Sequence, residues 1–400
     1  MTPQGGDTGL VGGQIPDGEV LLSTERLNRI REVSPGDDVI VAEAGVTLHA
    51  LREAAEAAGR LFPLSLASEG TCTVGGLLST NAGGTGVLRY GTTRELALGI
   101  EAVLPDGSLM HGLKRLRKDN TGYDLRGLLI GAYVTLGVIT ACAFKLFPRP
   151  ASRALAVVGL ERVEDALTLL ARAKSAAAGA VEAFELISGA GLALAVRVLP
   201  DTRAPLEATH PWTVLIELTS AEPDGAPPVM ERLLASALED GVIADAALAQ
   251  DETQAKAFWA LREGQSAAQK GEGAAWKHDV SVPVAFVPRF LHEATAAVEA
   301  FEPGVRVIAF GHVGDGNIHY DVARPVGGSD DAHDAKRNEG ARIVHDIVDR
   351  LGGSISAEHG LGTMKSAEAL RYKDPASVAA MRAVRLALDP GRIMNPRVLF

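Results

Sequence analysis

Several features that define whole classes of protein are scarce or absent in this chain. Cys72 and Cys142 are its two cysteines, and no C-x-x-C or zinc-ribbon spacing accompanies them, so we interpret both as small apolar residues in a reducing compartment. No apolar run approaches the ~20 residues that a membrane span needs. The amino terminus has neither the basic nor the apolar region of a signal peptide. These absences predict a cytoplasmic protein without a membrane span.

Basic residues are also outnumbered, and this limits the partners that we expect. The chain has 50 acidic and 39 basic residues, which gives a net charge of −11. Such a balance argues against a nucleic-acid-binding surface and is typical of a cytosolic enzyme.

The composition is otherwise ordinary, with 46% hydrophobic and 22% charged residues, and it predicts a globular protein. A length of 400 residues exceeds what one hydrophobic core usually supports, so we expect more than one domain. The first part of the chain alternates glycine-rich loops with short strands, and Pro148-Arg149-Pro150 indicates a boundary. Beyond it, longer amphipathic helices alternate with strands, which predicts an α+β unit with an antiparallel sheet.

The periodicity of apolar residues and the turn signals give the expected elements. We expect strands at residues 38–42, 99–104, 153–160, 212–218 and 276–282, and helices at residues 48–59 (capped by Thr47), 163–178, 228–239, 253–265, 288–301, 332–351 and 375–388.

The segment GHVGDGNIH carries the strongest chemical signal. The four residues 314–317 are rich in Gly and Asn, which predicts a hairpin loop between two strands. If Val313 pairs with Ile318, then His312 lies directly opposite His319. Directly opposed residues share a face, with Cβ atoms roughly 4.5–5.5 Å apart. Two imidazoles held in this way can bind one metal ion.

A carboxylate and a third imidazole, Glu358 and His359, follow within the segment SAEHG. Two His and one Glu leave an open coordination position, which is typical of a catalytic metal site. The alternative interpretation is that these histidines are ordinary half-buried residues with hydrogen-bond partners. The spacing by itself does not choose the metal.

Two glycine-rich loops in the first part of the chain are candidate phosphate-binding segments. They span residues 3–13 and 68–84. Glycines permit positive φ and allow backbone N–H groups to approach phosphate oxygens. Neither loop has the P-loop or GxGxxG spacing, so simple turns remain an equal alternative.

Seven segments resemble the motifs of one family, in that family's order: PQGGDTGLVGG, GTCTVGGLLSTNAGG, LRYG, KDNTGYDL, GHVGDGNIHY, SAEHGLG and DPGRIMNP. Through them the whole chain resembles the FAD-linked 2-hydroxyacid dehydrogenases of the vanillyl-alcohol-oxidase-type flavoprotein superfamily. The D-2-hydroxyglutarate and D-lactate dehydrogenase branch is the most similar. The resemblance implies an α+β fold, with an FAD-binding domain at residues 1–150, a substrate-binding cap domain at residues 151–370 and a helical return at residues 371–400.

The resemblance also implies a binding role for individual residues. The first glycine loop would hold the FAD pyrophosphate, through Gly5, Gly6, Asp7, Thr8 and Gly9. The second loop would run along the flavin, through Thr73, Gly75, Gly76, Asn81, Gly83 and Gly84. Asn395 would contact the isoalloxazine ring. No His occurs in the segment QGGD, where some relatives attach FAD covalently, so we expect noncovalent FAD.

In the cap domain, the resemblance implies a metal site and a substrate site. His312, His319 and Glu358 would bind a divalent metal, with zinc expected, and His359 would be the catalytic base. The substrate would contact Arg262, Ser266, Lys277 and Asn317.

The chemistry of these positions agrees with the assignment. Arg262 and Ser266 are four residues apart, so in one helix they share a face. Lys277 and Asp279 alternate onto one face of a strand. An Arg fork and a Lys are suited to carboxylates, although such residues also occur on solvated faces.

The sequence departs from the family pattern at two places. The family has a strand–helix–strand unit before the first glycine loop, so we expect an FAD-binding domain that is shortened at its amino terminus. Where the family has Gly-Ser-Glu-Gly-Thr-Leu-Gly, this chain has GAYVTLG at residues 131–137. Val134 thus replaces a glycine that permits close approach of the backbone, which predicts weakened FAD binding.

The leading hypothesis is metal-assisted oxidation of a D-2-hydroxy acid to the 2-oxo acid, with hydride transfer to flavin N5. The electron acceptor is undetermined, with an electron-transfer flavoprotein, a quinone or a cytochrome as candidates, and a homodimer is one candidate assembly. A first alternative is a non-catalytic flavoprotein-like subunit that binds a partner and has impaired FAD binding. A second is a related flavoenzyme of ether-lipid synthesis, which the absence of a basic membrane-binding surface disfavours.

Overall fold

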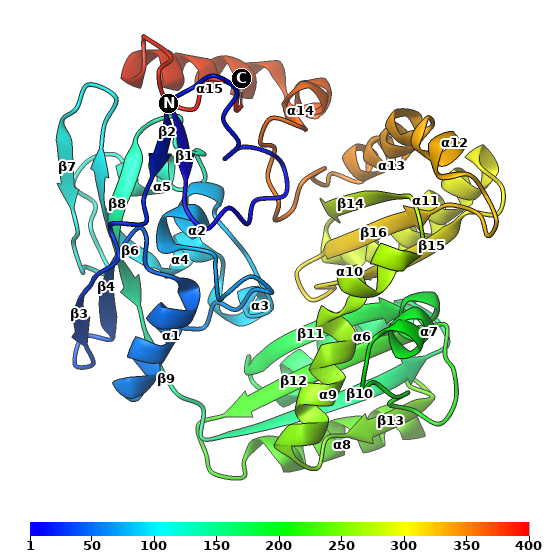
Figure 1. Ribbon diagram of the computed structural model, residues 1–400. Coiled ribbons are helices and arrows are strands. Elements are labelled where there is room, and N and C mark those ends of the chain that lie inside the picture. The colour runs from blue at the N-terminus through cyan, green and yellow to red at the C-terminus, as the bar shows by residue number, and fades with distance from the viewer. Residues whose placement is uncertain (400) are drawn as a thin grey trace. The chain divides into compact units, whose positions relative to one another are not determined.

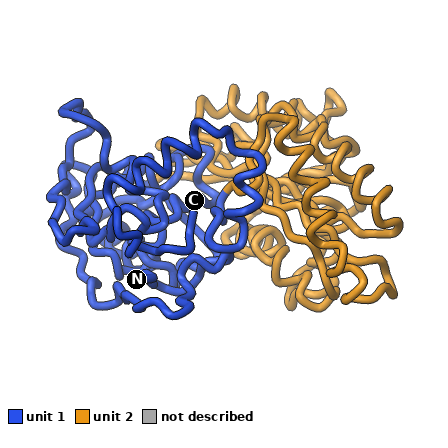
Figure 2. The backbone as a smooth tube through the Cα atoms, turned by 90° about the horizontal axis from the view of Figure 1, so that it is seen from above, with its two compact units in different colours: residues 1–149, 358–400 blue, residues 150–357 orange. Residues whose placement is uncertain are grey.

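The computed structural model describes residues 1–399 and divides into two compact units (Figure 2). Unit 1 joins residues 1–149 to the segment that begins at Glu358, and unit 2 contains Pro150–Ala357. We expected the chain to leave the cap domain at residue 370, whereas it returns to unit 1 earlier. The reason is that the segment after Ala357 forms hydrogen bonds to residues 1–149 within a few residues. The Leu361 N–H donates to the Tyr133 hydroxyl (3.0 Å), and the Thr363 N–H donates to the Val11 carbonyl (3.0 Å).

Unit 1 is built on a five-stranded sheet of order β3-β4-β8-β6-β7, in which all neighbours are antiparallel (Figure 1). Two small sheets, β1-β2 and β5-β9, complete it. Its elements are β1 (Thr2–Gln4), β2 (Leu21–Ser23), β3 (Ile30–Ser34), β4 (Val39–Glu43), α1 (Leu48–Ala57), β5 (Arg60–Leu61), α2 (Val74–Thr80), α3 (Val87–Tyr90), α4 (Thr93–Leu96), β6 (Ala97–Val103), β7 (Leu109–Gly112), α5 (Leu125–Leu129), β8 (Val138–Lys145), β9 (Phe147–Pro148), α14 (Ser366–Tyr372) and α15 (Pro375–Leu388).

Local sequence explains how α1 packs on this sheet. Thr47 caps the helix, because its side chain accepts a hydrogen bond from the Ala50 N–H (3.2 Å). Leu48 and Leu51 recur on one face and are fully buried in the core of unit 1, which also contains the strand residue Ile40. The first glycine-rich loop, which follows β1, therefore lies in a unit with a well-formed core.

The two ends of the described chain are joined within unit 1, and Figure 1 shows N and C beside α15. The Met1 ammonium donates to the Ile393 carbonyl (2.8 Å), and the Asn395 N–H donates to the Met1 carbonyl (2.8 Å). The carboxy-terminal segment is thereby fixed beside the strand that leads into the first glycine-rich loop.

Unit 2 is built on a seven-stranded sheet of order β13-β10-β12-β11-β15-β16-β14, again with antiparallel neighbours (Figure 1). This agrees with the antiparallel cap sheet that the sequence predicts. Its elements are β10 (Ser152–Leu160), α6 (Glu164–Ala176), β11 (Val181–Ser188), α7 (Gly189–Val198), β12 (Trp212–Ser220), α8 (Ala226–Glu239), β13 (Asp245–Leu248), α9 (Glu252–Glu263), α10 (Gln265–Ala268), β14 (Ala275–Ser281), α11 (Val287–Phe301), β15 (Arg306–Gly311), β16 (Asn317–Ala323), α12 (Asp330–Asp334), α13 (Arg337–Arg350) and short 3-10 turns at Gln269–Gly271 and Val284–Phe286.

Helices α7 and α9 pack on one face of this sheet. Leu194 of α7 and Leu261 of α9 share a cluster with Ile308 and Phe310 of β15. Because residues of a strand alternate between faces, Phe310 and its direct partner His319 on β16 lie on this same face. The face thus continues from an apolar, helix-covered part to a part that carries polar residues on β14 and β16.

The histidine hairpin forms, but with a register different from the predicted one. We expected His312 to lie opposite His319, whereas Phe310 is the partner of His319. The strand pair ends at Gly311, and residues 312–316 form the loop. The reason is the turn itself, since the N–H groups of Asp315 and Gly316 both donate to the His312 carbonyl (3.1 Å each). His312 therefore belongs to the loop.

Two predicted helices are interrupted, and several strands were missed, among them β3, β7, β8 and β13. The helix expected at residues 253–265 ends at Glu263, so Ser266 belongs to α10. Arg262 is buried whereas Ser266 is exposed, so the shared helix face that we expected does not exist. The helix expected at residues 332–351 is split into α12 and α13. Strand β11 was not among the expected elements.

The segment that departs from the family pattern has an unusual backbone. Tyr133 (φ +53°) and Val134 (φ +62°) both adopt left-handed conformations. A β-branched residue is strongly disfavoured there, and glycine is the residue that tolerates it. The structure thus gives a physical reason for a glycine at position 134. Val134 is nonetheless 7% exposed and packs with Val138 and Met394.

Replacement of Val134 by glycine tests this strain. The substitution removes a buried side chain but also relieves the left-handed β-branched residue. Val138→Gly is the matched control, because Val138 lies in the same cluster, is 8% exposed and has no positive φ. We expect Val134→Gly to lower the free energy of unfolding by about 1–3 kcal/mol less than Val138→Gly does. Equal losses in urea denaturation of the two variants would show that Val134 is not strained.

Candidate cofactor and substrate sites

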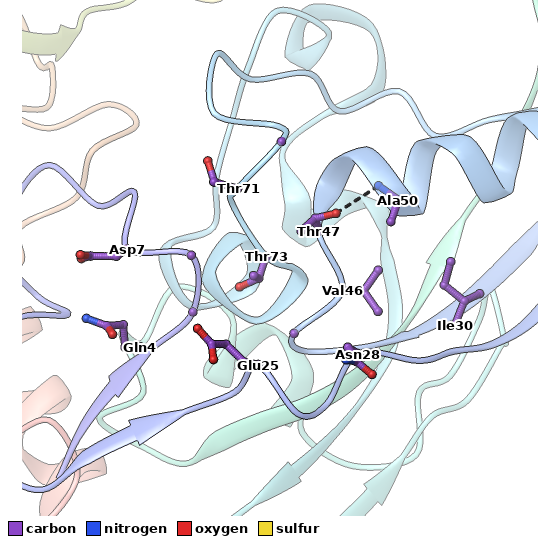
Figure 3. Close-up of a pocket in the computed structure, with 14 residues that line it drawn as sticks. Gln4, Asp7, Glu25, Asn28, Ile30, Val46, Thr47, Ala50, Thr71 and Thr73 are labelled. Atoms are coloured by element: carbon purple, nitrogen blue, oxygen red, sulfur yellow. Dashed lines mark hydrogen bonds between the residues drawn. The ribbon is translucent and has the colours of Figure 1, made fainter.

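A pocket of about 720 Å³ opens in unit 1 beside the first glycine-rich loop (Figure 3). Pockets of small-molecule ligands commonly have volumes of about 300–1,000 Å³. Three segments of the chain contribute most of its lining, at the end of β1, at the start of α1 and before α2. The lining residues are Gln4, Gly5, Gly6, Asp7, Glu25, Asn28, Ile30, Gly45, Val46, Thr47, Ala50, Gly70, Thr71 and Thr73. The two glycine-rich loops that the sequence analysis selected therefore meet at one cavity.

Close backbone approach explains the glycines in this pocket. A Cβ on Gly6 would lie 1.8 Å from the Thr71 carbonyl oxygen, and a Cβ on Gly5 would lie 2.2 Å from the Thr73 hydroxyl. Gly70 differs, because a Cβ there would meet nothing within 4 Å. The Thr73 hydroxyl is buried, and within residues 1–399 it has no hydrogen-bond partner. A buried hydroxyl without a partner costs free energy, so this atom favours a ligand with a polar group.

Other residues predicted for the flavin are not among those that line this pocket: Thr8, Gly9, Gly75, Gly76, Asn81, Gly83 and Gly84. Several of them pack against protein atoms. The Asn81 side chain accepts from the Arg94 N–H (2.9 Å), and Asn81 itself ends α2 with φ +51°. The Asn395 amide donates to the carbonyls of Gly13 (3.1 Å) and Tyr133 (2.9 Å). The described contacts of these two side chains are therefore structural.

A buried triad lies on the helix-covered face of the unit 2 sheet. Glu185 of β11 is 1% exposed. One of its carboxylate oxygens accepts from Nε of Arg262 (2.8 Å), and the other lies 2.7 Å from Nδ1 of His312. Nε2 of His312 lies 3.5 Å from a terminal guanidinium nitrogen of Arg262. The carboxylate thus connects the predicted substrate residue Arg262 with the predicted metal ligand His312.

The charges of this triad are mutually dependent. Burial alone would raise the pKa of Glu185, but the positive charges of His312 and Arg262 outweigh it and lower this pKa to about 2. The positive charge of His312 requires a proton on each ring nitrogen. When Nε2 gives up its proton, the carboxylate keeps the proton of Nδ1 in place, and Nε2 becomes the ring atom with a lone pair. Glu185 therefore favours the tautomer in which Nε2 can bind a cation.

A second polar group surrounds His319. Asp279 is its direct partner on β14, and Oδ1 of Asp279 lies 3.9 Å from Nδ1 of His319. The Asn317 amide donates to Asp279 (2.9 Å) and to the Val280 carbonyl (3.0 Å). The side-chain oxygen of Asn317 is buried and has no hydrogen-bond partner in the described part of the chain. The rings of His312 and His319 are 6.1 Å apart between centroids, so the changed register still brings the two histidines together.

Two overlapping groups of side chains could hold a metal ion. His312, His319 and Glu358 form one group, and Asp279, His319 and His359 form the other. Within each group, the candidate ligand atoms lie within 4.8 Å of one another. Glu358 and His359 directly follow Ala357, the last residue of unit 2. The N–H of Ala357 donates to the Asp279 carbonyl (3.1 Å).

Lys277, the remaining predicted substrate residue, lies on β14 directly opposite Asp321 of β16. Asp321 is 3% exposed, and Lys277 is exposed. Burial raises the pKa of Asp321 to about 6, and the positive charge of Lys277 opposes this shift.

Sequence reasoning missed Glu185 and Asp321. Glu185 is a lone carboxylate within the otherwise apolar stretch AFELI, and a charge in such a strand is a usable signal, because it must find a partner. Asp321 lies two residues after His319, so the alternation of a strand places the two on one face.

No helix within residues 1–399 combines the length and the apolar character that crossing a membrane requires.

Two protein-family models match the chain. A model described as "FAD binding domain" matches residues 1–112, and a model described as "FAD linked oxidases, C-terminal domain" matches residues 149–399.

Two relatives and one solved structure illustrate the similarity. The mitochondrial D-2-hydroxyglutarate dehydrogenase of Arabidopsis thaliana is 35% identical over 397 residues, which are 99% of this chain and 70% of the relative. The D-2-hydroxyglutarate dehydrogenase of Xanthomonas citri pv. viticola is 33% identical over 401 residues, which are 100% of this chain and 84% of the relative. The structure of an alkyldihydroxyacetonephosphate synthase has a TM-score of 0.71 at 16% identity, with 99% of this chain and 71% of that one covered. At such low identity, this likeness concerns the fold alone.

Replacement of Glu185 by glutamine tests the triad. The substitution keeps the shape of the side chain but leaves the guanidinium of Arg262 buried without its carboxylate. We expect the free energy of unfolding to fall by about 3–5 kcal/mol, as when one partner of a buried ion pair is removed. Glu207→Gln, at an exposed loop residue of the same unit, is the control and should change it by less than about 0.5 kcal/mol. Similar unfolding midpoints for the two variants would contradict this account.

Proposed function

The chain belongs to the family of FAD-linked oxidases, and from this premise we propose that it oxidises a D-2-hydroxy acid to the 2-oxo acid. It is an FAD-dependent oxidoreductase with the α+β fold of the vanillyl-alcohol-oxidase-type flavoproteins. The proposal is carried by one observation, the clustering of His312, His319 and Arg262 on one face of the unit 2 sheet. A cation site beside a guanidinium is suited to a hydroxy acid, which offers a hydroxyl and a carboxylate.

The pocket of unit 1 fits the phosphate-bearing part of FAD. Gly5 and Gly6 line the pocket with backbone that no side chain covers, which suits an anion, and the buried Thr73 hydroxyl can donate to a phosphate oxygen. We propose that these residues hold the pyrophosphate noncovalently, with Asp7 at the edge of the same loop. When bound, FAD supplies the position, flavin N5, that accepts a hydride from C2 of the substrate.

Replacement of Gly6 by alanine tests the cofactor pocket. The new Cβ would meet the Thr71 carbonyl at 1.8 Å, so the two loops must separate and the phosphate cradle is lost. We expect the purified variant to retain about tenfold less flavin, equivalent to ~1.4 kcal/mol of binding free energy. Gly70→Ala is the matched control, because it lies in the same pocket and has space for a Cβ. Equal flavin absorbance of the two variants would place the cofactor elsewhere.

We further propose that His312, His319 and Glu358 would hold a divalent cation, with zinc expected. The donor set of two imidazoles and a carboxylate is suited to zinc and leaves a coordination position open. A bound cation supplies a Lewis acid that lowers the pKa of the substrate hydroxyl. Glu185 orients His312 for this role, because it holds the proton of Nδ1.

The remaining polar residues would bind the substrate and move its proton. Arg262 would bind the C1 carboxylate through its terminal nitrogens, because Glu185 occupies Nε. The side-chain oxygen of Asn317, which has no partner within residues 1–399, would accept a hydrogen bond from the substrate. His359 would take the proton of the hydroxyl group as the general base. Lys277 of β14 would bind the substrate as well. Ser266 is exposed, and no substrate contact is proposed for it.

Purification and assay of the protein test the proposed reaction. We expect the absorption spectrum of bound flavin, and reduction of a dye with a D-2-hydroxy acid but not with its L enantiomer. A chelator should lower the rate, and added zinc should restore it. His359→Ala should lower kcat by ~10²–10⁴, the usual contribution of a general base, without loss of flavin.

His292→Ala is the control for the histidine variant. His292 is an exposed residue of α11 in unit 2, and its replacement should leave kcat within twofold, or about 0.4 kcal/mol. An unchanged rate in His359→Ala or in the presence of chelator would contradict the metal–base mechanism. A purified protein that binds no flavin would instead favour the non-catalytic, partner-binding alternative.

Three finer aspects stay predictions. The electron acceptor is expected to be an electron-transfer flavoprotein, a quinone or a cytochrome, and a homodimer remains a candidate assembly. The cytoplasmic location is expected from the sequence, whereas the relative of Arabidopsis thaliana is named as mitochondrial.

A further inference from the structure

On the sheet face of unit 2 where the substrate is proposed to bind, the two cations Arg262 and Lys277 are already opposed by carboxylates of the protein. Arg262 forms an ion pair with the buried Glu185 (2.8 Å). Lys277 lies directly opposite the buried Asp321 in the pairing of β14 with β16. Asp279, which is 1% exposed, adds a third carboxylate on the same strand face.

The pairing of Lys277 with Asp321 places the backbones of the two residues opposite one another. Directly opposed residues of antiparallel strands have Cβ atoms roughly 4.5–5.5 Å apart and point to the same face. Asp321 is buried on a strand, so its position is set by the sheet, whereas Lys277 is exposed at the end of a flexible stem. A ligand group that binds Lys277 near the sheet is therefore also close to the negative charge of Asp321.

This arrangement is poorly suited to a second carboxylate on the substrate. A dicarboxylate would use one carboxylate at Arg262 and would bring the other to Lys277. There the attraction of Lys277 is offset by the repulsion of Asp321, which the sheet holds in place. A fixed negative charge beside a bound carboxylate weakens the binding of that ligand relative to a neutral one. Such repulsion is a common basis of specificity.

We propose that Asp321 makes the site selective for D-2-hydroxy monocarboxylic acids, with a neutral group in place of the second carboxylate. D-Lactate, with a methyl group there, and D-glycerate, with a hydroxyl group that could donate to Asp321, represent the class. The inference rests on the proposed function and narrows its substrate. It differs from what the names of the two relatives describe, which is D-2-hydroxyglutarate, a dicarboxylate.

The test compares specificity constants of the flavin-loaded enzyme, measured by dye reduction. D-Lactate and D-glycerate are set against D-2-hydroxyglutarate and D-malate. We expect kcat/KM of the wild-type enzyme to be higher for the monocarboxylates by about tenfold or more. Asp321→Asn removes the fixed negative charge and should shift the ratio of the two constants toward the dicarboxylates by about tenfold.

Asp349→Asn is the control for the loss of one negative charge from unit 2. Asp349 is exposed near the end of α13, and its replacement should leave the ratio as it is in the wild type. A wild-type preference for D-2-hydroxyglutarate or D-malate would overturn the inference, even if Asp321→Asn failed to fold. An unchanged ratio in a folded Asp321→Asn enzyme would also overturn it.

Failure of the proposed function has a different outcome. In that case none of the four acids reduces the dye, although flavin is bound, and the specificity inference falls with it. Turnover of dicarboxylates alone would overturn the inference and leave the proposed function supported.

Discussion

The buried carboxylate of Glu185 is the constraint on which the polar part of the helix-covered face of unit 2 depends. It contacts Arg262 of α9 and His312 of the hairpin loop, so one side chain joins a strand, a helix and a loop. An isolated carboxylate in this position would cost several kcal/mol of desolvation, so it requires charged partners. Those partners are thereby held in place before any ligand arrives.

The consequences of this contact extend across the face. The guanidinium of Arg262 lies 5.2 Å from the ring centre of Phe310, and the Phe310 ring is 5.0 Å from that of His319. The two histidines are thus positioned from different sides, His312 by a carboxylate and His319 by an aromatic ring and Asp279. Side chains that are already held in this way lose little further conformational entropy on contact with a ligand.

A comparable constraint in unit 1 is steric. Tyr133 is held in a left-handed conformation, its carbonyl accepts from the Asn395 amide and its hydroxyl accepts from the Leu361 N–H. A Cβ on Gly360 would lie 1.4 Å from this hydroxyl, so glycine is required at position 360. The motif that contains Glu358 and His359 therefore follows a path that this tyrosine restricts. At Tyr133, where the sequence departs from the family pattern, the hydrogen bonds from the Asn395 amide and the Leu361 N–H hold the residue in place.

Motifs and periodicity predicted much of the fold, and their failures have physical causes. The helix capped by Thr47 and the strands of residues 153–160 and 212–218 follow from local signals, which the structure reproduces. The hairpin register was wrong by two residues, because the His312 carbonyl accepts the turn bonds. The shared face of Arg262 and Ser266 failed because α9 ends at Glu263. The periodicity of apolar residues predicts neither the hydrogen bonds of the turn nor the end of α9.

The sequence by itself determined which residue types are present, which strands carry histidine, lysine and aspartate on one face, and which family the motifs resemble. Alternation along a strand is a local property, so it can be read from neighbouring residues. The tertiary structure decided which charges meet. Glu185 lies 127 residues from His312 and 77 from Arg262, and Lys277 meets Asp321 only through sheet register. Such contacts depend on strand order and register, which the packing of the whole sheet selects.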